Sequence, residues 1–532
     1  MASTTPGSLK PQPTAMGNRE DTPESLCGSQ DIEFRYLELD TPLPTPCITL
    51  PPGPAQSPPP EAPSLEKYTS PFLWPQWRKS MMTYIACGVT ALAGYAAGEV
   101  SPASEELTEL WGISTVVYNL SITVFCCGFA LAPMVLAPFS EINGRRPIFI
   151  ASGILFVGTQ SFAGLLVARF FQGVGGSTFS TMVGGVISDI YHAQDRNTPM
   201  ALFSGAALFG TGLAPLISGA IISHTTWRWV FYSHAIVSAA FVIAIYFFFK
   251  ETRGSVLLSR KAANEESSEE KCIRRIRWKV KSDEQRASIV TMIQISLYRP
   301  FHMLLTEPVV FFFSLWVSFS WAVLYLQFSS VPLIFRTNHN FTIEQTGAVF
   351  TSMCVGVIII TIISIYQERI AMRFGKHTTS PEGRLYFVCV ESVLLPIGLF
   401  WFGWSSFPSV HWIVPAIAVG CATMGIFSIY LATFNYLADT YHRYASSAIA
   451  AQSCCRNLLG GIFPLVTNAM FTNLGYPEAS SLLGGLGAAL TLVPWVLALY
   501  GPTIRARSKL ASRISTANAT KRPDRWSEFS SQ

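Results

Sequence analysis

The stretch APFSEINGRRPIFI, residues 137–150, separates two long apolar segments of the chain. It places one acid, one glycine and two arginines close together, although only 13% of the whole chain is charged. Gly144 permits a tight turn, and Glu141 can form charge-assisted hydrogen bonds with Arg145 or Arg146. We therefore expect a short turn between two helices that carries a latch, meaning an ion pair from Glu141 to an arginine. The alternative is that the two arginines only determine which side of a membrane the turn occupies.

Composition on either side of this stretch favours a membrane protein. Of the 532 residues, 50% are hydrophobic, and apolar windows long enough to cross a bilayer recur along the chain. We predict an all-α membrane protein with twelve transmembrane helices. The predicted spans are 81–99, 115–137, 148–164, 167–188, 199–222, 228–249, 307–331, 345–366, 384–404, 410–434, 446–471 and 479–501.

A charged linker divides the spans into six and six, which prompts a search for an internal repeat. SDIYH at 188–192 matches ADTYH at 438–442, and YQERIAMRFGK at 366–376 weakly matches the opening stretch. These pairs predict two pseudo-symmetric six-helix bundles. The expected parts are a disordered tail (1–79), the first bundle (80–250), the linker (251–300), the second bundle (301–501) and a second tail (502–532).

The distribution of Lys and Arg among the loops predicts that both termini are cytoplasmic. On this orientation the basic segment KCIRRIRWKV, residues 271–280, would lie on the anionic cytoplasmic leaflet. Asn340, in the sequence Asn-Phe-Thr, would face the other side, where it can be glycosylated. We expect the plasma membrane, with an organellar membrane (vacuole, peroxisome or vesicle) as the alternative.

Ionisable residues inside the apolar spans are candidates for function. Arg169 needs a partner or a water-filled cavity, because an unpaired cation there would cost roughly 2.5–3.5 kcal/mol. Glu391 could carry a proton or meet a substrate, or it could form a structural ion pair with Arg456; both readings stay open. The candidates for a substrate path are Tyr118, Asn119, Gln172, Gln327, Tyr430, Asn435 and Arg456.

Two further patterns concern the helix ends and one helix face. Asp189 and Asp439 end their predicted helices, with Arg196 and Arg443 nearby, so they are either ion pairs that control opening or solvated helix ends. A stripe of small residues would let the fifth span approach a neighbour closely and bend, which packing alone explains nearly as well as function. The stripe consists of Gly210, Ala214, Pro215, Ser218 and Gly219.

Several of these segments resemble signatures of one family. APFSEINGRRP is similar to the sequence between helices two and three of the major facilitator superfamily, with Ala137 where glycine is usual. LLVARFFQGVGGS resembles its helix-four signature, and GTGLAPLISGA its helix-five antiporter signature. PEGRLYFV and YLADTYHRYASSAIAAQSCCRNLLGGIFP resemble the fungal drug:proton antiporter branch, which includes multidrug and polyamine exporters. The resemblance covers residues 80–502 and implies the major facilitator fold, a role for Arg169 in proton coupling, and antiport.

These features predict a secondary active transporter that exports a drug or secondary metabolite by proton antiport. In polyamine exporters an acid often precedes the proline of helix seven, whereas this chain has Ser329 and Ser330 before Pro332, which favours a neutral or anionic compound. The alternatives are proton-coupled uptake or organellar import of a precursor, and a sensor that does not transport. One proton moving down 100 mV would supply about 2.3 kcal/mol.

Other functional classes find no support in the sequence. It has no GxxxxGK[ST], HExxH or GxSxG motif, so an ATP-driven pump and a membrane enzyme are not predicted. We expect a monomer whose partners are the substrate, protons and the lipid bilayer, without a metal, a cofactor or a nucleic acid. The segment from Gly144 to Asp189 is shorter than its counterpart from Gly375 to Asp439, because its outer loop is minimal or because residues are missing.

Overall fold

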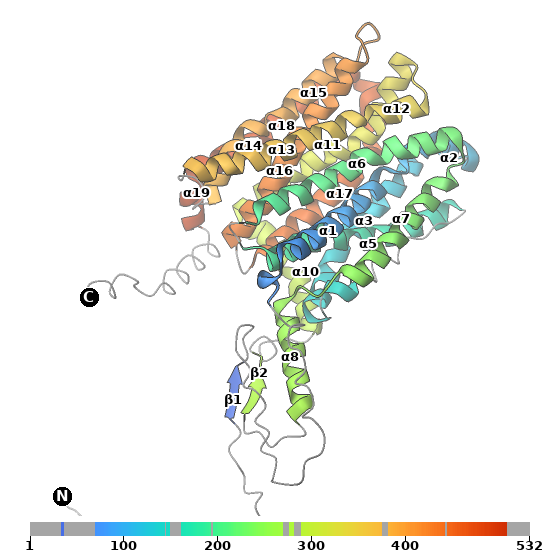
Figure 1. Ribbon diagram of the computed structural model, residues 1–532. Helices are drawn as coiled ribbons and strands as arrows, with labels where there is room; N and C mark the ends of the chain where they lie inside the picture. The colour runs from blue at the N-terminus through green and yellow to red at the C-terminus, as the bar shows by residue number, and fades with distance from the viewer. Residues whose placement is uncertain are drawn as a thin grey trace, which may run out of the picture. The chain divides into compact units, whose positions relative to one another are not determined.

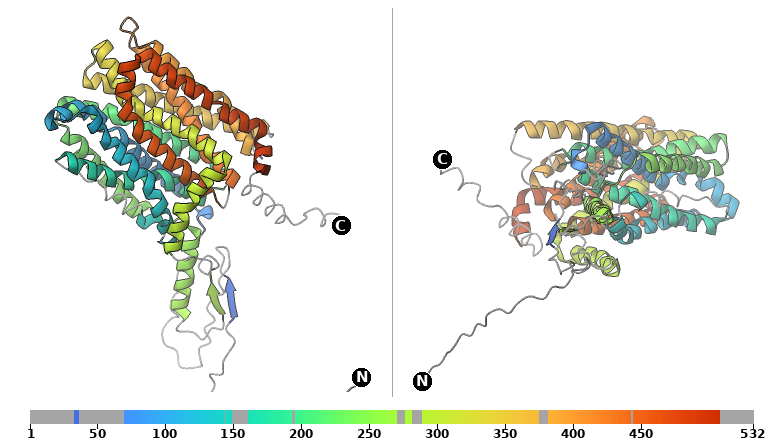
Figure 2. Two further views of the ribbon diagram at one scale, coloured as in Figure 1. Left: turned by 180° about the vertical axis from the view of Figure 1, so that it is seen from behind. Right: turned by 60° about the horizontal axis from the view of Figure 1, so that its bottom comes forward.

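The computed structural model describes residues 33–36, 70–143, 145–148, 161–192, 195–269, 276–280, 289–374, 381–441 and 444–507. The chain divides into two compact units, described here separately. The smaller takes residues 1–63 and 258–285, and the larger takes residues 64–257 and 286–532. The larger unit is a bundle of long helices that lie side by side (Figures 1 and 2).

The amino-terminal half of the bundle follows the apolar segments closely. Long apolar runs become helices because a helix satisfies every backbone hydrogen bond within the segment, as a bilayer requires. A short helix, α2 (Ser104–Trp111), follows the 3-10 turn Ser101–Ala103, and the turn Pro71–Leu73 precedes α1. The long helices are α1 (Gln76–Gly98), α3 (Thr115–Asn143), α5 (Phe162–Ile190), α6 (Asn197–His224) and α7 (Arg228–Phe248).

The carboxy-terminal half repeats this plan with more interruptions. Three predicted spans are each built from two helices in series, namely the eighth, the ninth and the twelfth. A 3-10 turn, Pro381–Arg384, precedes the ninth. The helices are α11 (Pro308–His339), α12 (Ile343–Val349), α13 (Thr351–Phe374), α14 (Leu385–Glu391), α15 (Leu394–Trp404), α16 (Ile413–Tyr441), α17 (Ala445–Leu474), α18 (Tyr476–Leu490) and α19 (Leu492–Arg507).

The predicted all-α membrane fold is confirmed. Each predicted span except the third has a helix at its position, and most of the third, residues 149–160, lies outside the described part of the chain. Within the described residues, nine helical segments are long and apolar enough to cross a membrane. The linker adds two helices that we did not predict, α8 (Gly254–Glu269) and α10 (Ile289–Thr306).

The smaller unit holds a pair of parallel strands. β1 (Glu33–Tyr36) comes from the predicted disordered tail and pairs with β2 (Ile276–Lys279) from the basic linker segment, with Glu33 opposite Ile276. The expectation of a structureless tail over residues 1–79 is therefore wrong at these four positions, and also at the turn Pro71–Leu73 and the start of α1. Apolar and basic residues alternate in Ile-Arg-Trp-Lys, which suits a strand with one apolar face and one basic face. Residues Ile276–Lys279 of the basic segment therefore form β2.

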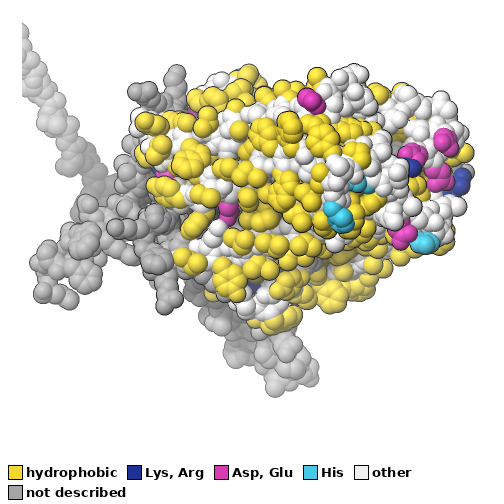
Figure 3. Space-filling model, turned by 90° about the horizontal axis from the view of Figure 1, so that it is seen from above, with side chains coloured by type: hydrophobic (Ala, Val, Ile, Leu, Met, Phe, Trp, Pro, Cys, Tyr) yellow, Lys and Arg dark blue, Asp and Glu magenta, His cyan; other side chains and the backbone are white. Residues whose placement is uncertain are grey.

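The surface of the bundle is apolar over a wide face, and in Figure 3 charged side chains gather toward the end that carries α2 in Figure 1. Large apolar side chains such as Phe247 and Leu499 are about 70% exposed. A soluble protein would lose stability by exposing so large an apolar area, whereas lipid covers it in a bilayer. A separate group of charged residues, which includes Arg145, Asp189 and Glu251, lies at the other end of the helices. We call that end the charged end after this group, and the end that carries α2 the opposite end.

Candidate functional site

A buried carboxylate lies where three helices of the amino-terminal half meet. Glu99, at the end of α1, is completely buried, and its Oε1 lies 3.3 Å from Nη1 of Arg169 on α5. The same oxygen accepts a hydrogen bond of 2.8 Å from Nε2 of Gln172. Its other oxygen, Oε2, lies 2.6 Å from Nδ1 of His234 on α7. We call Glu99, Arg169, Gln172 and His234 the Glu99 cluster.

The guanidinium of Arg169 is saturated by its surroundings. Nη1 also donates to Oε1 of Gln172 at 2.7 Å and to the carbonyl of Ala96, and the group lies 4.5 Å from the centroid of the Phe125 ring. Arg169 therefore has an acidic partner, Glu99. The sequence predicted either such a partner or a water-filled cavity, because Arg169 lies in an apolar span. A buried pair of this kind is stable only because further hydrogen bonds compensate for the lost hydration.

Sequence reasoning missed two members of this cluster. Glu99 is the last residue of the first predicted span, where an acid is easily taken for a span boundary, and His234 lies within the sixth. Both are ionisable residues in apolar segments, which is the criterion that selected Arg169. Applying it at span ends as well would have found Glu99.

Beside the cluster, the buried Tyr118 donates from its hydroxyl to the Val100 carbonyl at 2.7 Å.

A second buried arginine lies in the carboxy-terminal half in a different environment. Arg456 on α17 is completely buried, with its guanidinium 4.3 Å from the Trp321 ring centroid and 4.9 Å from that of Tyr430. Nη2 donates a long hydrogen bond of 3.4 Å to the hydroxyl of Ser453. Among the described residues, Nε and Nη1 of Arg456 and the Tyr430 hydroxyl have no hydrogen-bond partner.

The predicted alternative that Arg456 pairs with Glu391 is wrong. Glu391 is the last residue of α14 and accepts a hydrogen bond of 2.5 Å from Nε2 of Gln367 on α13. Arg456 instead lies against the aromatic rings of α11 and α16. The two side chains are held by different neighbouring helices, which sequence spacing does not reveal.

The remaining substrate-path candidates differ in their surroundings. Gln327 on α11 is buried, and its Oε1 has no hydrogen-bond partner among the described residues. Asn119 donates to the Pro464 carbonyl at 2.8 Å, and Asn435 donates to Oδ1 of Asn197 at 3.1 Å. Both of these hydrogen bonds join the two halves, so these asparagines hold the halves together in this conformation.

At the charged end, Arg145 is the centre of the contacts. Its Nε donates to Oδ2 of Asp189 at 2.9 Å, and its backbone N–H donates to Oε1 of Glu251 at 3.0 Å. Asp189 also lies 3.9 Å from Nη1 of Arg253. The predicted pairing of Asp189 with Arg196 is thus corrected to Arg145 and Arg253, because the turn after α7 brings Glu251 and Arg253 to this end.

The rest of the predicted latch is described only in part. Arg146 donates from its backbone N–H to Oε2 of Glu251 at 3.3 Å and from Nη2 to the Tyr246 carbonyl at 2.6 Å. Arg196 donates from Nη2 to the Ser188 carbonyl at 3.5 Å. Asp439 lies two residues before the end of α16. The side chain of Glu141, and both Gly144 and Arg443, lie outside the described residues.

The carboxy-terminal half has a related contact that is also made by a carboxylate. Glu382, just before α14, lies 2.7 Å from Nη2 of Arg505 at the end of α19. In the first half, Arg145 precedes the third predicted span, and its backbone N–H donates to Glu251, which follows the sixth. In the second half, Glu382 precedes the ninth predicted span and pairs with Arg505, which follows the twelfth. In both halves a carboxylate thus joins the segment before the third span of the half to the segment after its sixth.

The small-residue stripe of α6 lies against two helices. At Gly210 an added Cβ would collide with the Ala91 carbonyl of α1, and at Gly219 it would come 3.4 Å from the Cα of Gly347 in α12. Pro215 lies inside the helix, and Ser218 donates to the Ala214 carbonyl at 2.6 Å. Close packing thus accounts for the glycines of the stripe.

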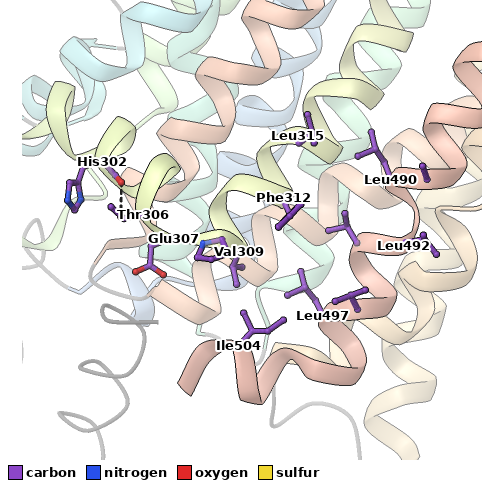
Figure 4. A pocket seen from close by; sticks show the side chains of 14 residues that line it. His302, Thr306, Glu307, Val309, Phe312, Leu315, Leu490, Leu492, Leu497 and Ile504 are labelled. Atoms are coloured by element: carbon purple, nitrogen blue, oxygen red, sulfur yellow. Dashed lines mark hydrogen bonds between the residues drawn. The ribbon is translucent and has the colours of Figure 1, made fainter. Parts of the chain in front are cut away.

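Two cavities lie away from the buried arginines. One of about 930 Å³ has apolar walls from α11, α18 and α19, with His302, Thr306 and Glu307 at one edge (Figure 4). The other, of about 230 Å³, lies between the halves near the opposite end, beside Ser101 and Arg336. Neither is lined by Arg169 or Arg456, so both arginines are enclosed in this conformation.

Asn340 is exposed between α11 and α12, and its glycosylation stays a prediction.

Comparisons with known proteins agree with this arrangement. The family model described as Major Facilitator Superfamily matches residues 85–464. The chain is 31% identical over 458 residues to "Efflux pump FUBT" of Fusarium oxysporum, covering 83% of this chain and 75% of that one. It is 32% identical over 454 residues to "Citrinin biosynthesis cluster MFS transporter mrr1" of Monascus ruber, covering 83% and 90%. The fold is similar to that of the partially occluded inward open xylose transporter XylE of E. coli, with a TM-score of 0.58 at 15% identity over 79% of this chain and 98% of that one.

Proposed function

The chain belongs to the major facilitator superfamily and is a multi-pass membrane transporter, and from this premise we propose that it exports a small organic compound in exchange for protons. The Glu99 cluster carries this proposal, because it places an acid, a histidine and an arginine in contact within the membrane-spanning bundle. An exporter that uses a proton gradient needs a group that binds a proton in one conformation and releases it in another.

Proton binding at Glu99 would change the contacts of three helices at once. The ionised carboxylate holds α1, α5 and α7 together through Arg169, Gln172 and His234. A proton on Glu99 removes its negative charge and thus weakens its contact with Arg169, whose positive charge then needs another partner. Protonation and the packing of these helices are therefore linked, which is the requirement for coupling proton movement to a conformational change.

The contacts between the halves fit alternating access. At the opposite end Ser101 donates to the Phe328 carbonyl at 2.6 Å, and an ion pair joins Glu105 to Arg336. Toward the charged end Asn435 and Asn197 join the halves. We infer that the two sets of contacts break in turn. We also propose that both termini lie in the cytoplasm and that the protein is located in the plasma membrane.

We infer the substrate class from two buried positions of the carboxy-terminal half. The acid expected before Pro332 in a polycation exporter is absent, and Ser330 there is buried. The buried ionisable side chain of α17 is a cation, Arg456. Both observations favour a neutral or anionic compound. The names of the relatives, an efflux pump and a transporter of a biosynthesis cluster, support export of a drug or secondary metabolite.

Transport into inverted membrane vesicles tests the proposal. Fluorescein, a neutral coumarin and the cation rhodamine 123 would serve as probes of the three charge classes. We expect accumulation of the anionic or neutral probe that stops when a protonophore collapses the gradient and in the variant Glu99→Gln. The matched control Glu109→Gln, which changes an exposed acid of α2, should transport normally. Accumulation that is indifferent to the protonophore would remove the antiport claim.

A further inference from the structure

We propose that Arg456, Trp321 and Tyr430 form an anion subsite that binds the carboxylate or phenolate of a planar aromatic substrate. This inference rests on the proposed transport function and assigns its substrate class. None of the comparisons assigns a role to these residues. The three side chains come from α17, α11 and α16, which all belong to the carboxy-terminal half.

Arg456 has no acidic partner among the described residues. Its side chain is completely buried, and no ion pair with an acid forms within the described residues. Two of its three guanidinium nitrogens, Nε and Nη1, have no hydrogen-bond partner there. Arg169, by contrast, is saturated by a carboxylate, an amide and a carbonyl. An arginine does not lose its proton in proteins, so Arg456 keeps a charge and two donor nitrogens that an anionic ligand can satisfy.

Two aromatic rings surround the guanidinium of Arg456. The Trp321 and Tyr430 rings lie 4.9 Å apart at an interplanar angle of 33°, and the guanidinium lies within 5 Å of both. Aromatic rings hold a guanidinium by cation–π attraction without occupying its N–H groups. The planar N–H fork is thereby left for a carboxylate or a phenolate, and the adjacent rings offer a flat apolar surface to an aromatic ligand.

Several buried neutral polar groups of α11, α16 and α17 form no hydrogen bond within the described residues. The Tyr430 hydroxyl, the indole N–H of Trp321 and both amide atoms of Gln452 are buried without a hydrogen-bond partner among the described residues. Gln452 lies one turn before Arg456 and therefore shares its side of α17. Buried polar groups are normally satisfied, so these donors and acceptors suit the hydroxyl or carbonyl groups of a bound aromatic compound.

Access to the subsite depends on the separation of the two halves. α17 packs on α3 of the other half, where Thr123 donates to the Gly461 carbonyl at 2.7 Å and Asn119 to the Pro464 carbonyl at 2.8 Å. Cys126 of α3 lies against Gly461, close to Arg456 along α17. When these contacts part, the enclosed face of α17 opens to the path between the halves.

Binding to the purified full-length protein tests this inference without any gradient. The probes are 2-naphthoate, which is ionised at pH 7.5, and 2-naphthamide, its neutral counterpart of similar shape. Isothermal titration should show that the wild type binds the acid at least about tenfold more tightly than the amide, as expected of a charge-assisted hydrogen bond. Arg456→Gln should abolish this preference, while Arg456→Lys, which keeps the charge, should retain part of it.

A matched control is available in Arg228→Gln. Arg228 is exposed and also lies over a tryptophan, 4.6 Å from the Trp227 ring, so its loss should leave the preference unchanged. Equal affinity for the acid and the amide in the wild type would overturn the inference, and so would a preference that persists in Arg456→Gln. If chloride displaces 2-naphthoate while naphthamide fails to bind at all, the occupant is an inorganic anion and the aromatic assignment is wrong. Charge-selective binding without proton-driven transport would instead refute the proposed function alone.

Discussion

At the scale of single residues, the two buried arginines differ in what surrounds them. Arg169 has Glu99 at 3.3 Å, whereas Arg456 has two aromatic rings and a distant serine hydroxyl. A paired charge can serve as a switch, because a proton on the acid changes the balance of the pair. An arginine without an acid can serve as a binding site, because its charge is constant. The same residue type thus suits coupling in one half and recognition in the other.

Stability measurements on Glu99 and Arg169 test whether they act as a pair. Glu99→Gln leaves Arg169 buried without its carboxylate, and Arg169→Gln leaves Glu99 buried without its cation. Each single variant should lose roughly 3–5 kcal/mol of stability, as when one partner of a buried ion pair is removed. The double variant should lose clearly less than the sum of the two. Thermal unfolding in detergent measures this, and additive losses would show that the pair is not coupled.

At the scale of elements, glycines determine how closely the helices approach. α1 and α6 meet where Gly210 leaves no room for a Cβ beside the Ala91 carbonyl, and Gly94 faces the Ala207 carbonyl in the same way. Two backbones in such contact gain packing that lipid cannot supply. The stripe of α6 is therefore explained by structure before any role in antiport is invoked.

The substitution Gly210→Ala tests the importance of this contact. A methyl group there must displace the backbone of α1, so we expect a loss of about 1–3 kcal/mol, as for overpacked cores. Gly485→Ala in α18 is the matched control, since nothing lies within 4 Å of the added Cβ and alanine favours a helix. The melting temperature in detergent should fall for the first variant only. An unchanged melting temperature for Gly210→Ala would mean that α1 and α6 tolerate separation.

At the scale of the whole bundle, the halves touch near both ends, and each half buries one of the two arginines among its own helices. The contacts at the opposite end include Ser101 with Phe328, and the contact toward the charged end joins Asn197 to Asn435. Transport by alternating access requires that each set opens while the other stays closed. Holding one set closed should therefore stop transport without unfolding the protein.

Cross-linking of α6 to α16 tests this requirement. The variant Asn197→Cys/Asn435→Cys places two thiols where the native amides lie 3.1 Å apart. Treatment with a short bifunctional thiol reagent should abolish probe accumulation in vesicles. Each single-cysteine variant, treated in the same way, controls for reaction at the native cysteines and should remain active. Full transport by the cross-linked double variant would contradict alternating access at this interface.

Much of the fold could be predicted because its signals are local. The length of the apolar runs predicts membrane helices, and SDIYH and ADTYH indicate the repeat of two halves. The prediction that Arg169 needs a partner rests on the cost of a bare charge in an apolar span. Two pairings were wrong: Glu391 with Arg456, and Asp189 with Arg196. Both pairings were inferred from nearness in sequence or from residue type. Neither of these signals shows which helices face each other.

The sequence by itself determined the membrane class, the positions of most helices, the family and the presence of costly ionisable residues inside the spans. These depend on composition and on spacing within one segment. Only the tertiary structure decided that Glu99 and His234 surround Arg169, that aromatic rings surround Arg456, and that Glu251 reaches Arg145. Each of these contacts joins helices or turns distant in the chain, and the direction in which a buried side chain points depends on how the helices pack.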